Sequence, residues 1–211
     1  MEKRFLKLTS AEWKENIDSL IWAVALALAI RTFVIAPFKI PSGSMHPTLL
    51  EGDRILVTKF EYRFHPPRRG DIVVFYYPNE WHSLPERMHQ FFDASRPLGG
   101  RFSQLMTAGR PFIKRLVGMG GDHIEIRDSH LYINGSRLES NEVFQTNHYY
   151  NDGMYGQAGQ VIDVPPEAYF VLGDNSGSSH DSRFWGFVPK RLLIGRARCI
   201  FWPLTRWRIL H

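Results

Sequence analysis

The residues of this chain best suited to chemistry are two serines in a short loop. Residues 40–49 read Ile-Pro-Ser-Gly-Ser-Met-His-Pro-Thr-Leu and follow directly on a long apolar segment. Serine is a weak nucleophile until a neighbouring base takes its proton. The same residues, flanked by Pro41 and Pro47, are also typical of an ordinary turn. The loop therefore predicts a nucleophile only if the fold supplies a base.

The candidate bases are a lysine and a histidine. Residues 112–117 (Phe-Ile-Lys-Arg-Leu-Val) are typical of a buried strand, in which Lys114 shares a face with apolar side chains because strand side chains alternate. Burial disfavours the ammonium form and lowers the lysine pKa, so Lys114 can act as a neutral general base. Arg115 has equally apolar neighbours, but arginine stays charged. His46 lies only two residues from Ser44 and is too close along the chain to turn back easily.

The segment before the serine loop is long enough to cross a membrane. Residues 19–38 are mostly apolar, with Arg31 as the interruption, and about 20 helical residues span about 30 Å. We expect a cytoplasmic segment over residues 1–18, a transmembrane anchor over 19–38 and an extracytoplasmic domain over 39–211, because basic residues are more frequent before the segment. The alternative is a cleaved signal peptide, with residues 27–29 as its small-x-small site.

The rest of the chain has the features of a β-protein. Three Gly-Asp turns are each followed by apolar or β-branched residues, and an Asn-Gly pair predicts a hairpin. Short strands joined by turns imply a mainly β fold of antiparallel sheets. The Gly-Asp turns begin at Gly52, Gly70 and Gly121, the Asn-Gly pair is residues 134–135, and further strands are expected at 168–172 and 193–202.

Three finer expectations concern particular regions. Alternation in strand 193–202 places Ala197, Cys199 and Phe201 on one face. Residues 79–110 exceed an ordinary loop and are expected to form a functional or mobile insert with a short helix, the alternative being a poorly ordered surface excursion. Residues 122–165 are expected to form a small subdomain.

Composition excludes several classes of function. The net charge is +5, but the basic residues are scattered, which favours anionic lipid headgroups over nucleic acid as partners. One cysteine excludes an internal disulfide and an all-cysteine metal site. The nine histidines show no His-Glu-x-x-His spacing, so neither a metal nor another cofactor is expected.

Four motifs occur in order after the apolar segment. They are residues 41–45 (Pro-Ser-Gly-Ser-Met), 69–75 (Arg-Gly-Asp-Ile-Val-Val-Phe), 113–118 (Ile-Lys-Arg-Leu-Val-Gly) and 173–183 (Gly-Asp-Asn-x-x-x-Ser-x-Asp-Ser-Arg). Together they resemble the boxes of bacterial type I signal peptidase (leader peptidase), and the similarity covers most of the chain beyond the apolar segment. This resemblance implies a mostly antiparallel β-fold that carries a serine–lysine dyad.

The resemblance also implies roles for individual residues. Ser44 matches the nucleophile and Lys114 the general base, while Ser42 matches a hydroxyl donor to the oxyanion beside the backbone N–H of Ser44. Ser179 matches the residue that orients the lysine amine. The remaining matches are a supporting ion pair and the walls of small substrate pockets, at Asp181 and Arg183 and at Ile40, Pro41, Met45, Leu49 and Ile113. The chain departs from the family pattern at Ser176 and Gly177, where Arg and Asp are common.

The expected activity is that of a serine endopeptidase at the bacterial cytoplasmic membrane. It would remove signal peptides from exported preproteins by cutting after small-x-small sites, with the preproteins, the lipid bilayer and the secretion translocon as partners. One alternative is a non-catalytic, membrane-tethered β-domain that binds a secreted partner. A self-cleaving repressor-type protease is a weaker alternative, because it requires a helix-turn-helix where this chain has an apolar segment.

Overall fold

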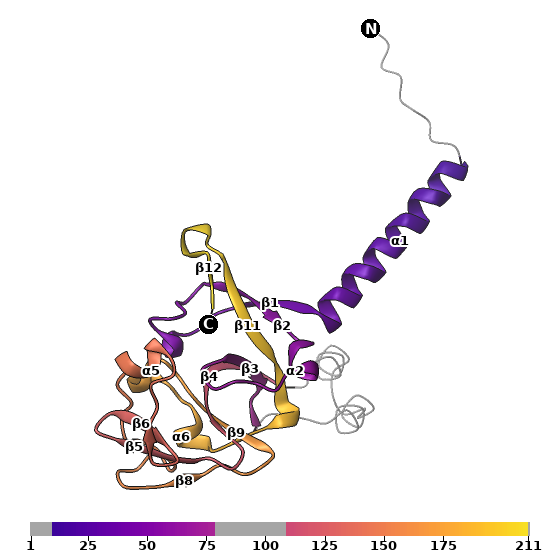
Figure 1. Ribbon diagram of the computed structural model, residues 1–211. Coiled ribbons are helices and arrows are strands. Elements are labelled where there is room, and N and C mark those ends of the chain that lie inside the picture. Colours follow the sequence, from indigo (N-terminus) through magenta and orange to yellow (C-terminus); the bar gives the residue numbers. More distant parts are fainter. Residues whose placement is uncertain (1–9, 79–108, 211) are drawn as a thin grey trace, which may run out of the picture.

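The computed structural model describes residues 10–78 and 109–210 (Figure 1). The elements are α1 (Ser10–Phe33), β1 (Ile35–Lys39), η1 (Gly43–Met45), β2 (Arg54–Thr58), α2 (Glu61–Phe64), β3 (Ile72–Tyr76), β4 (Pro111–Met119), β5 (His123–Arg127), β6 (His130–Ile133), β7 (Ser136–Arg137), α5 (Glu142–Thr146), β8 (Ile162–Asp163), β9 (Ala168–Leu172), η3 (Ser176–Ser178), α6 (Ser182–Trp185), β10 (Val188–Pro189), η4 (Lys190–Leu192), β11 (Leu193–Trp202), η5 (Leu204–Arg206) and β12 (Arg208–Ile209).

The larger of two sheets has eight strands in the order β1-β2-β11-β3-β4-β9-β10, with β12 paired to β11. All of its pairs are antiparallel, so the prediction of a mainly β, antiparallel fold is confirmed. The strands predicted after the Gly-Asp turns are β2, β3 and β5. Gly52, Gly70 and Gly121 have φ values of 87°, 96° and 92°, which explains the glycine at each turn.

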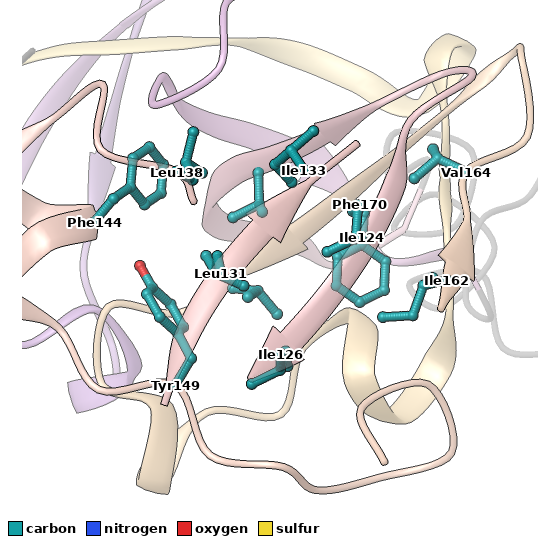
Figure 2. Close-up of a cluster of buried hydrophobic side chains, with 12 residues drawn as sticks. Ile124, Ile126, Leu131, Ile133, Leu138, Phe144, Tyr149, Ile162, Val164 and Phe170 are labelled. Carbon is teal, nitrogen blue, oxygen red and sulfur yellow. The ribbon is translucent and has the colours of Figure 1, made fainter. Parts of the chain in front are cut away.

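The smaller sheet has four strands in the order β7-β6-β5-β8 and covers the region expected to form a small subdomain. Its predicted hairpin is β6–β7, where Asn134 and Gly135 both have positive φ, as a type I′ turn requires. The apolar face of this sheet packs against side chains of β4 and β9, and Figure 2 shows Ile124, Leu131 and Phe170 within that cluster. This shared core fixes the two sheets against each other.

The strand that carries the predicted base lies inside the larger sheet. Strand β4 pairs with β3 on one side and β9 on the other, and Lys114 is opposite Val73 in the register. Both faces of β4 are covered, since Lys114 is 4% exposed and Arg115 1% exposed. Sequence alternation could not decide which cation is buried; in the structure both are.

Helix α1 differs from the expected anchor at its C-terminal end. The helix ends at Phe33, so residues 35–38 belong to strand β1, which pairs with β2. Figure 1 shows α1 projecting away from the sheets. In the part of the chain that the structure describes, no helix is both long and apolar enough to cross a membrane.

The face predicted for strand 193–202 is wrong beyond residue 197. The register of β11 against β2 shifts between Ala197 and Cys199, which is a β-bulge. Ala197 and Ile200 therefore both face the core, while Phe201 and Cys199 are half-buried. Most of the expected insert, including its short helix, falls on residues 79–108 and lies outside the described residues.

Candidate active site

The structure brings Ser44 and Lys114 together although 70 residues separate them. The Lys114 Nζ donates a hydrogen bond of 2.6 Å to the Ser44 Oγ. Ser44 lies in η1, the single turn formed by the Ser-Gly-Ser loop, and Lys114 projects from the middle of β4. Both side chains are buried, with Ser44 8% and Lys114 4% exposed. The hydroxyl and the amine are thus within proton-transfer distance in a site with little access to bulk water.

The environment of Lys114 favours its neutral form. Burial lowers the pKa of Lys114 from 10.5 to about 8, although the nearby carboxylates of Asp181 and Asp174 raise it in part. The guanidinium of Arg183 lowers it further. At this pKa, a substantial fraction of the amine is unprotonated near neutral pH and can accept a proton.

The turn after β9 holds the serine loop in place. The backbone N–H of Asn175 donates to the carbonyl of Ser44 at 3.1 Å, and the Asn175 side chain donates to the carbonyl of Gly43 at 3.1 Å. Gly173 lies so close to the loop that a Cβ at this position would be 2.5 Å from the Ser44 carbonyl oxygen and 2.2 Å from the Ser179 Oγ. Asn175 belongs to the Gly-Asp-Asn motif, but the motif alone did not predict this role.

Asp181 and Arg183 form the ion pair that the resemblance implied, and it is almost completely buried. The Arg183 Nε donates to Asp181 at 2.9 Å, and its Nη2 donates to the carbonyls of Ser176 and Ser179. Asp181 also accepts the backbone N–H of Gly173 at 3.0 Å. The pair therefore fixes the backbone on both sides of the turn that contacts the serine loop.

Ser179 does not hydrogen-bond to Lys114 in the structure, contrary to expectation. The Ser179 Oγ is buried and has no hydrogen-bond partner within the described residues. It lies against the backbone of Gly173, which carries no side chain to displace it. Ser179 is therefore next to the site but is not joined to the amine.

A second buried ion pair lies on the other face of β4. Arg115 makes two hydrogen bonds to Asp174, at 2.8 and 2.7 Å, and a third to the carbonyl of Gly70. Both side chains of the pair are at most 1% exposed. Because Asp174 immediately precedes Asn175, the pair ties the turn that holds Ser44 to the strand that carries Lys114.

An apolar cavity of about 490 Å³ opens beside the two side chains. Ser42, Ser44 and Lys114 lie along it, and so do three residues expected to form substrate pockets. Those three are Ile40, Pro41 and Ile113. Further lining residues were not predicted from the sequence, among them Phe38, Ile55, Val74 and Phe112.

Two residues expected at the substrate pockets do not line this cavity. Met45 and Leu49 are fully buried in the hydrophobic cluster that also contains Ile40, so they support the cavity wall from behind.

Ser42, the predicted oxyanion donor, is exposed and lies directly before η1, and its side chain makes no capping hydrogen bond. Within residues 10–78 and 109–210, no histidine hydrogen-bonds to Ser44, and the buried Nε2 of His46 has no partner there.

Comparison with known proteins identifies the family. The sequence pattern of the family described as "Signal peptidase, peptidase S26" matches residues 13–202. The chain belongs to this signal peptidase family. It is 38% identical to a probable signal peptidase I-2 of Synechocystis over 94% of this chain and 77% of that protein. It is also 38% identical to a signal peptidase I of Leptolyngbya laminosa, over 91% of this chain and 81% of that protein.

A solved structure of a signal peptidase I from Enterococcus faecalis is also similar. It shares 28% identity and has a TM-score of 0.42, over 63% of this chain and 97% of that chain. As a signal peptidase of family S26, the chain is a serine endopeptidase that removes signal peptides. The alternative of a non-catalytic β-domain is therefore not supported.

Proposed function

We propose that Ser44 and Lys114 carry out peptide cleavage as a dyad, and the 2.6 Å hydrogen bond between them is the observation that carries this proposal. Neutral Lys114 takes the Ser44 proton while the Ser44 Oγ attacks the carbonyl carbon of the scissile bond. The resulting Lys114 ammonium then gives its proton to the leaving amine as the C–N bond breaks. In the second half of the reaction, Lys114 takes a proton from the water that attacks the acyl-enzyme. It then gives this proton to the Ser44 Oγ as the ester C–O bond breaks, which restores Ser44 and the neutral amine.

The oxyanion of each tetrahedral intermediate needs hydrogen-bond donors. We assign this role to the backbone N–H of Ser44 and the hydroxyl of Ser42, which lies along the same cavity and caps no helix. The apolar walls at Ile40 and Ile113 suit small side chains on the signal-peptide side of the cut. The preference for small-x-small sites is the part of the proposal that rests on the resemblance to the family, and the apolar lining is compatible with it.

The proposal includes attachment to the bacterial cytoplasmic membrane, with helix α1 as the anchor and the catalytic domain on the extracytoplasmic face. In support, the side chains of residues 16–27 are all exposed and include large apolar residues such as Leu20 and Trp22. The β11–β12 hairpin adds the half-exposed aromatics Trp202 and Trp207, which suit the headgroup region. In this arrangement the lipid bilayer and the secretion translocon bring the preprotein to Ser44.

One double variant, compared with the wild type, tests the membrane part of the proposal. Trp202→Ser combined with Trp207→Ser should reduce cleavage of a preprotein presented on vesicles and leave cleavage of a short soluble peptide unchanged. Equal rates on vesicles for this double variant and the wild type would contradict the assignment of the hairpin to the bilayer surface.

The dyad is tested by incubating the full chain, in detergent, with a preprotein. The wild type should release the mature product, whereas Ser44→Ala should release none. Ser136→Ala, on exposed strand β7, is the control and should retain full activity. Cleavage by Ser44→Ala at the wild-type rate would refute the assignment of the nucleophile.

A further inference from the structure

The loop that carries the nucleophile is closed at its base by the turn that follows it. The backbone N–H of Ile40 donates to the carbonyl of Asp53 at 2.8 Å, and the backbone N–H of Gly52 donates to the carbonyl of Ile40 at 2.9 Å. Residues 40–53 therefore form one closed loop. Because Ser44 lies close to Ile40 along the chain, movement at this base would displace the nucleophile.

The carboxylate of Asp53 fixes the base of this loop. Its Oδ2 accepts the backbone N–H of Leu50 at 2.8 Å, within the same turn. The side chain is only 1% exposed, and a carboxylate removed from water needs a cationic partner. That partner is Arg206, whose Nε and Nη2 donate to the two carboxylate oxygens, each at 2.9 Å. Two parallel hydrogen bonds fix the orientation of the carboxylate as well as balancing its charge.

Arg206 comes from a distant part of the chain. It is the last residue of η5, at the tip of the β11–β12 hairpin (yellow in Figure 1), and lies 153 residues after Asp53 in the sequence. Its side chain is 31% exposed, and it does not line the cavity beside Ser44. The hairpin tip thus supplies a charged group to the serine loop from outside the active site.

Two further contacts hold the same hairpin against the serine loop. The side chain of Arg208, in β12, donates to the carbonyl of Thr48. Leu210 is 4% exposed and belongs to the same hydrophobic cluster as Met45, the residue directly after Ser44. The hairpin therefore contacts the loop both at its base and next to the nucleophile.

We propose that Arg206 is a positioning residue for peptide cleavage. It orients the Asp53 carboxylate, which fixes the base of the serine loop and so holds the Ser44 Oγ against the Lys114 amine. This inference rests on the proposed dyad, because it concerns the placement of Ser44. Misplacement of a reacting group by about 1 Å can cost about 10²-fold in rate, so the loss of part of this support should lower kcat about tenfold.

A second Gly-Asp turn, residues 121–122, provides a matched control. The Asp122 Oδ2 accepts the backbone N–H of Met119 at 2.6 Å, and Asp122 pairs with Arg69 at 2.8 Å, so this carboxylate has the same two kinds of partner as Asp53. The turn connects β4 to β5 rather than closing the serine loop. Asp53→Asn and Asp122→Asn therefore remove the same charge from the same type of turn, but only Asp53→Asn affects the base of the loop.

Cleavage of a short soluble peptide by the full chain, in detergent, tests the proposal. Arg206→Gln should lower kcat about tenfold and change KM by less than about twofold, and Arg206→Lys, which keeps the charge, should recover part of the loss. The midpoint of the pH profile should stay near pH 8, because Lys114 is unchanged. Asp53→Asn should behave like Arg206→Gln, whereas Asp122→Asn should keep the wild-type kcat. Urea unfolding at the assay temperature confirms that each variant is folded.

A double-mutant cycle tests whether Arg206 acts through Asp53. Arg206→Gln combined with Asp53→Asn should lower kcat no more than the larger of the two single losses, because both substitutions break the same contact. Losses that multiply would overturn the proposal, as would a wild-type kcat in Arg206→Gln or an equal loss of kcat in Asp122→Asn. Ser44→Ala is measured in parallel. An active Ser44→Ala would overturn the dyad and this inference with it, whereas an inactive Ser44→Ala beside a fully active Arg206→Gln would refute this inference alone.

Discussion

The lowered pKa of Lys114 makes a quantitative prediction for the pH dependence of cleavage. With a pKa of about 8, roughly 9% of the amine is neutral at pH 7, whereas a lysine at its ordinary pKa of 10.5 would be only about 0.03% neutral. Burial therefore raises the concentration of the active base roughly 300-fold. From pH 7 to its plateau, kcat/KM should rise about tenfold, with a midpoint near pH 8.

The assay is the initial rate of peptide cleavage at substrate concentrations well below KM, from pH 6 to pH 10. Lys114→Arg should be as inactive as Lys114→Ala over this range, because the guanidinium keeps its proton. A midpoint near pH 6.5, or an active Lys114→Arg enzyme, would refute the reasoning and point to His46 or His180 as the base.

The same lysine makes the stability of the fold depend on pH. The pKa of Lys114 is lower in the folded state, so between about pH 8 and pH 10.5 the unfolded chain binds more protons and the free energy of unfolding rises with pH. Burial of the Lys114 amine therefore lowers the free energy of unfolding at neutral pH by about 3 kcal/mol. Lys114→Met should lack this rise, as urea unfolding at several pH values would show.

Three further substitutions test the surroundings of the dyad. Gly173→Ala should lower kcat by on the order of 10²-fold, because its Cβ would displace the Ser44 carbonyl, while Gly177→Ala, with no atom closer than 3.5 Å, should remain active. Ser42→Ala should lower kcat by about 10²–10³-fold with little change in KM, whereas Ser42→Thr should keep much of the activity because it keeps the hydroxyl. An unchanged kcat in Ser42→Ala would mean that backbone N–H groups alone stabilise the oxyanion. Asp174→Asn should reduce the free energy of unfolding by about 3–5 kcal/mol, because it removes the carboxylate charge that balances the buried Arg115 guanidinium. A loss below 1 kcal/mol in urea unfolding would contradict this.

Local sequence patterns predicted the elements whose conformation depends on neighbouring residues. Gly-Asp turns and the Asn134-Gly135 pair identified strands and a hairpin, since these turns need residues that tolerate positive φ. Alternation failed in β11, because the bulge after Ala197 depends on the register with β2, which no local pattern encodes. The end of α1 was misplaced for the same reason, as residues 35–38 are drawn into a sheet by pairing with β2.

The candidate site was only partly predictable. The resemblance identified Ser44, Lys114 and the ion pair of Asp181 and Arg183, because these residues lie in motifs with fixed spacing. The hydrogen bonds from Asn175 to the serine loop depend on two turns that meet only in the fold, so spacing could not reveal them.

The central claim, that Ser44 is the nucleophile and Lys114 its base, is tested most directly by locating the acyl group during the reaction. The full chain is treated at pH 9 with an activated ester of an Ala-x-Ala peptide, quenched in acid and mapped by mass spectrometry. The account predicts an acyl group on Ser44, none in Ser44→Ala, and much slower labelling in Lys114→Met. Labelling of another serine, or undiminished labelling in Ser44→Ala, would contradict it.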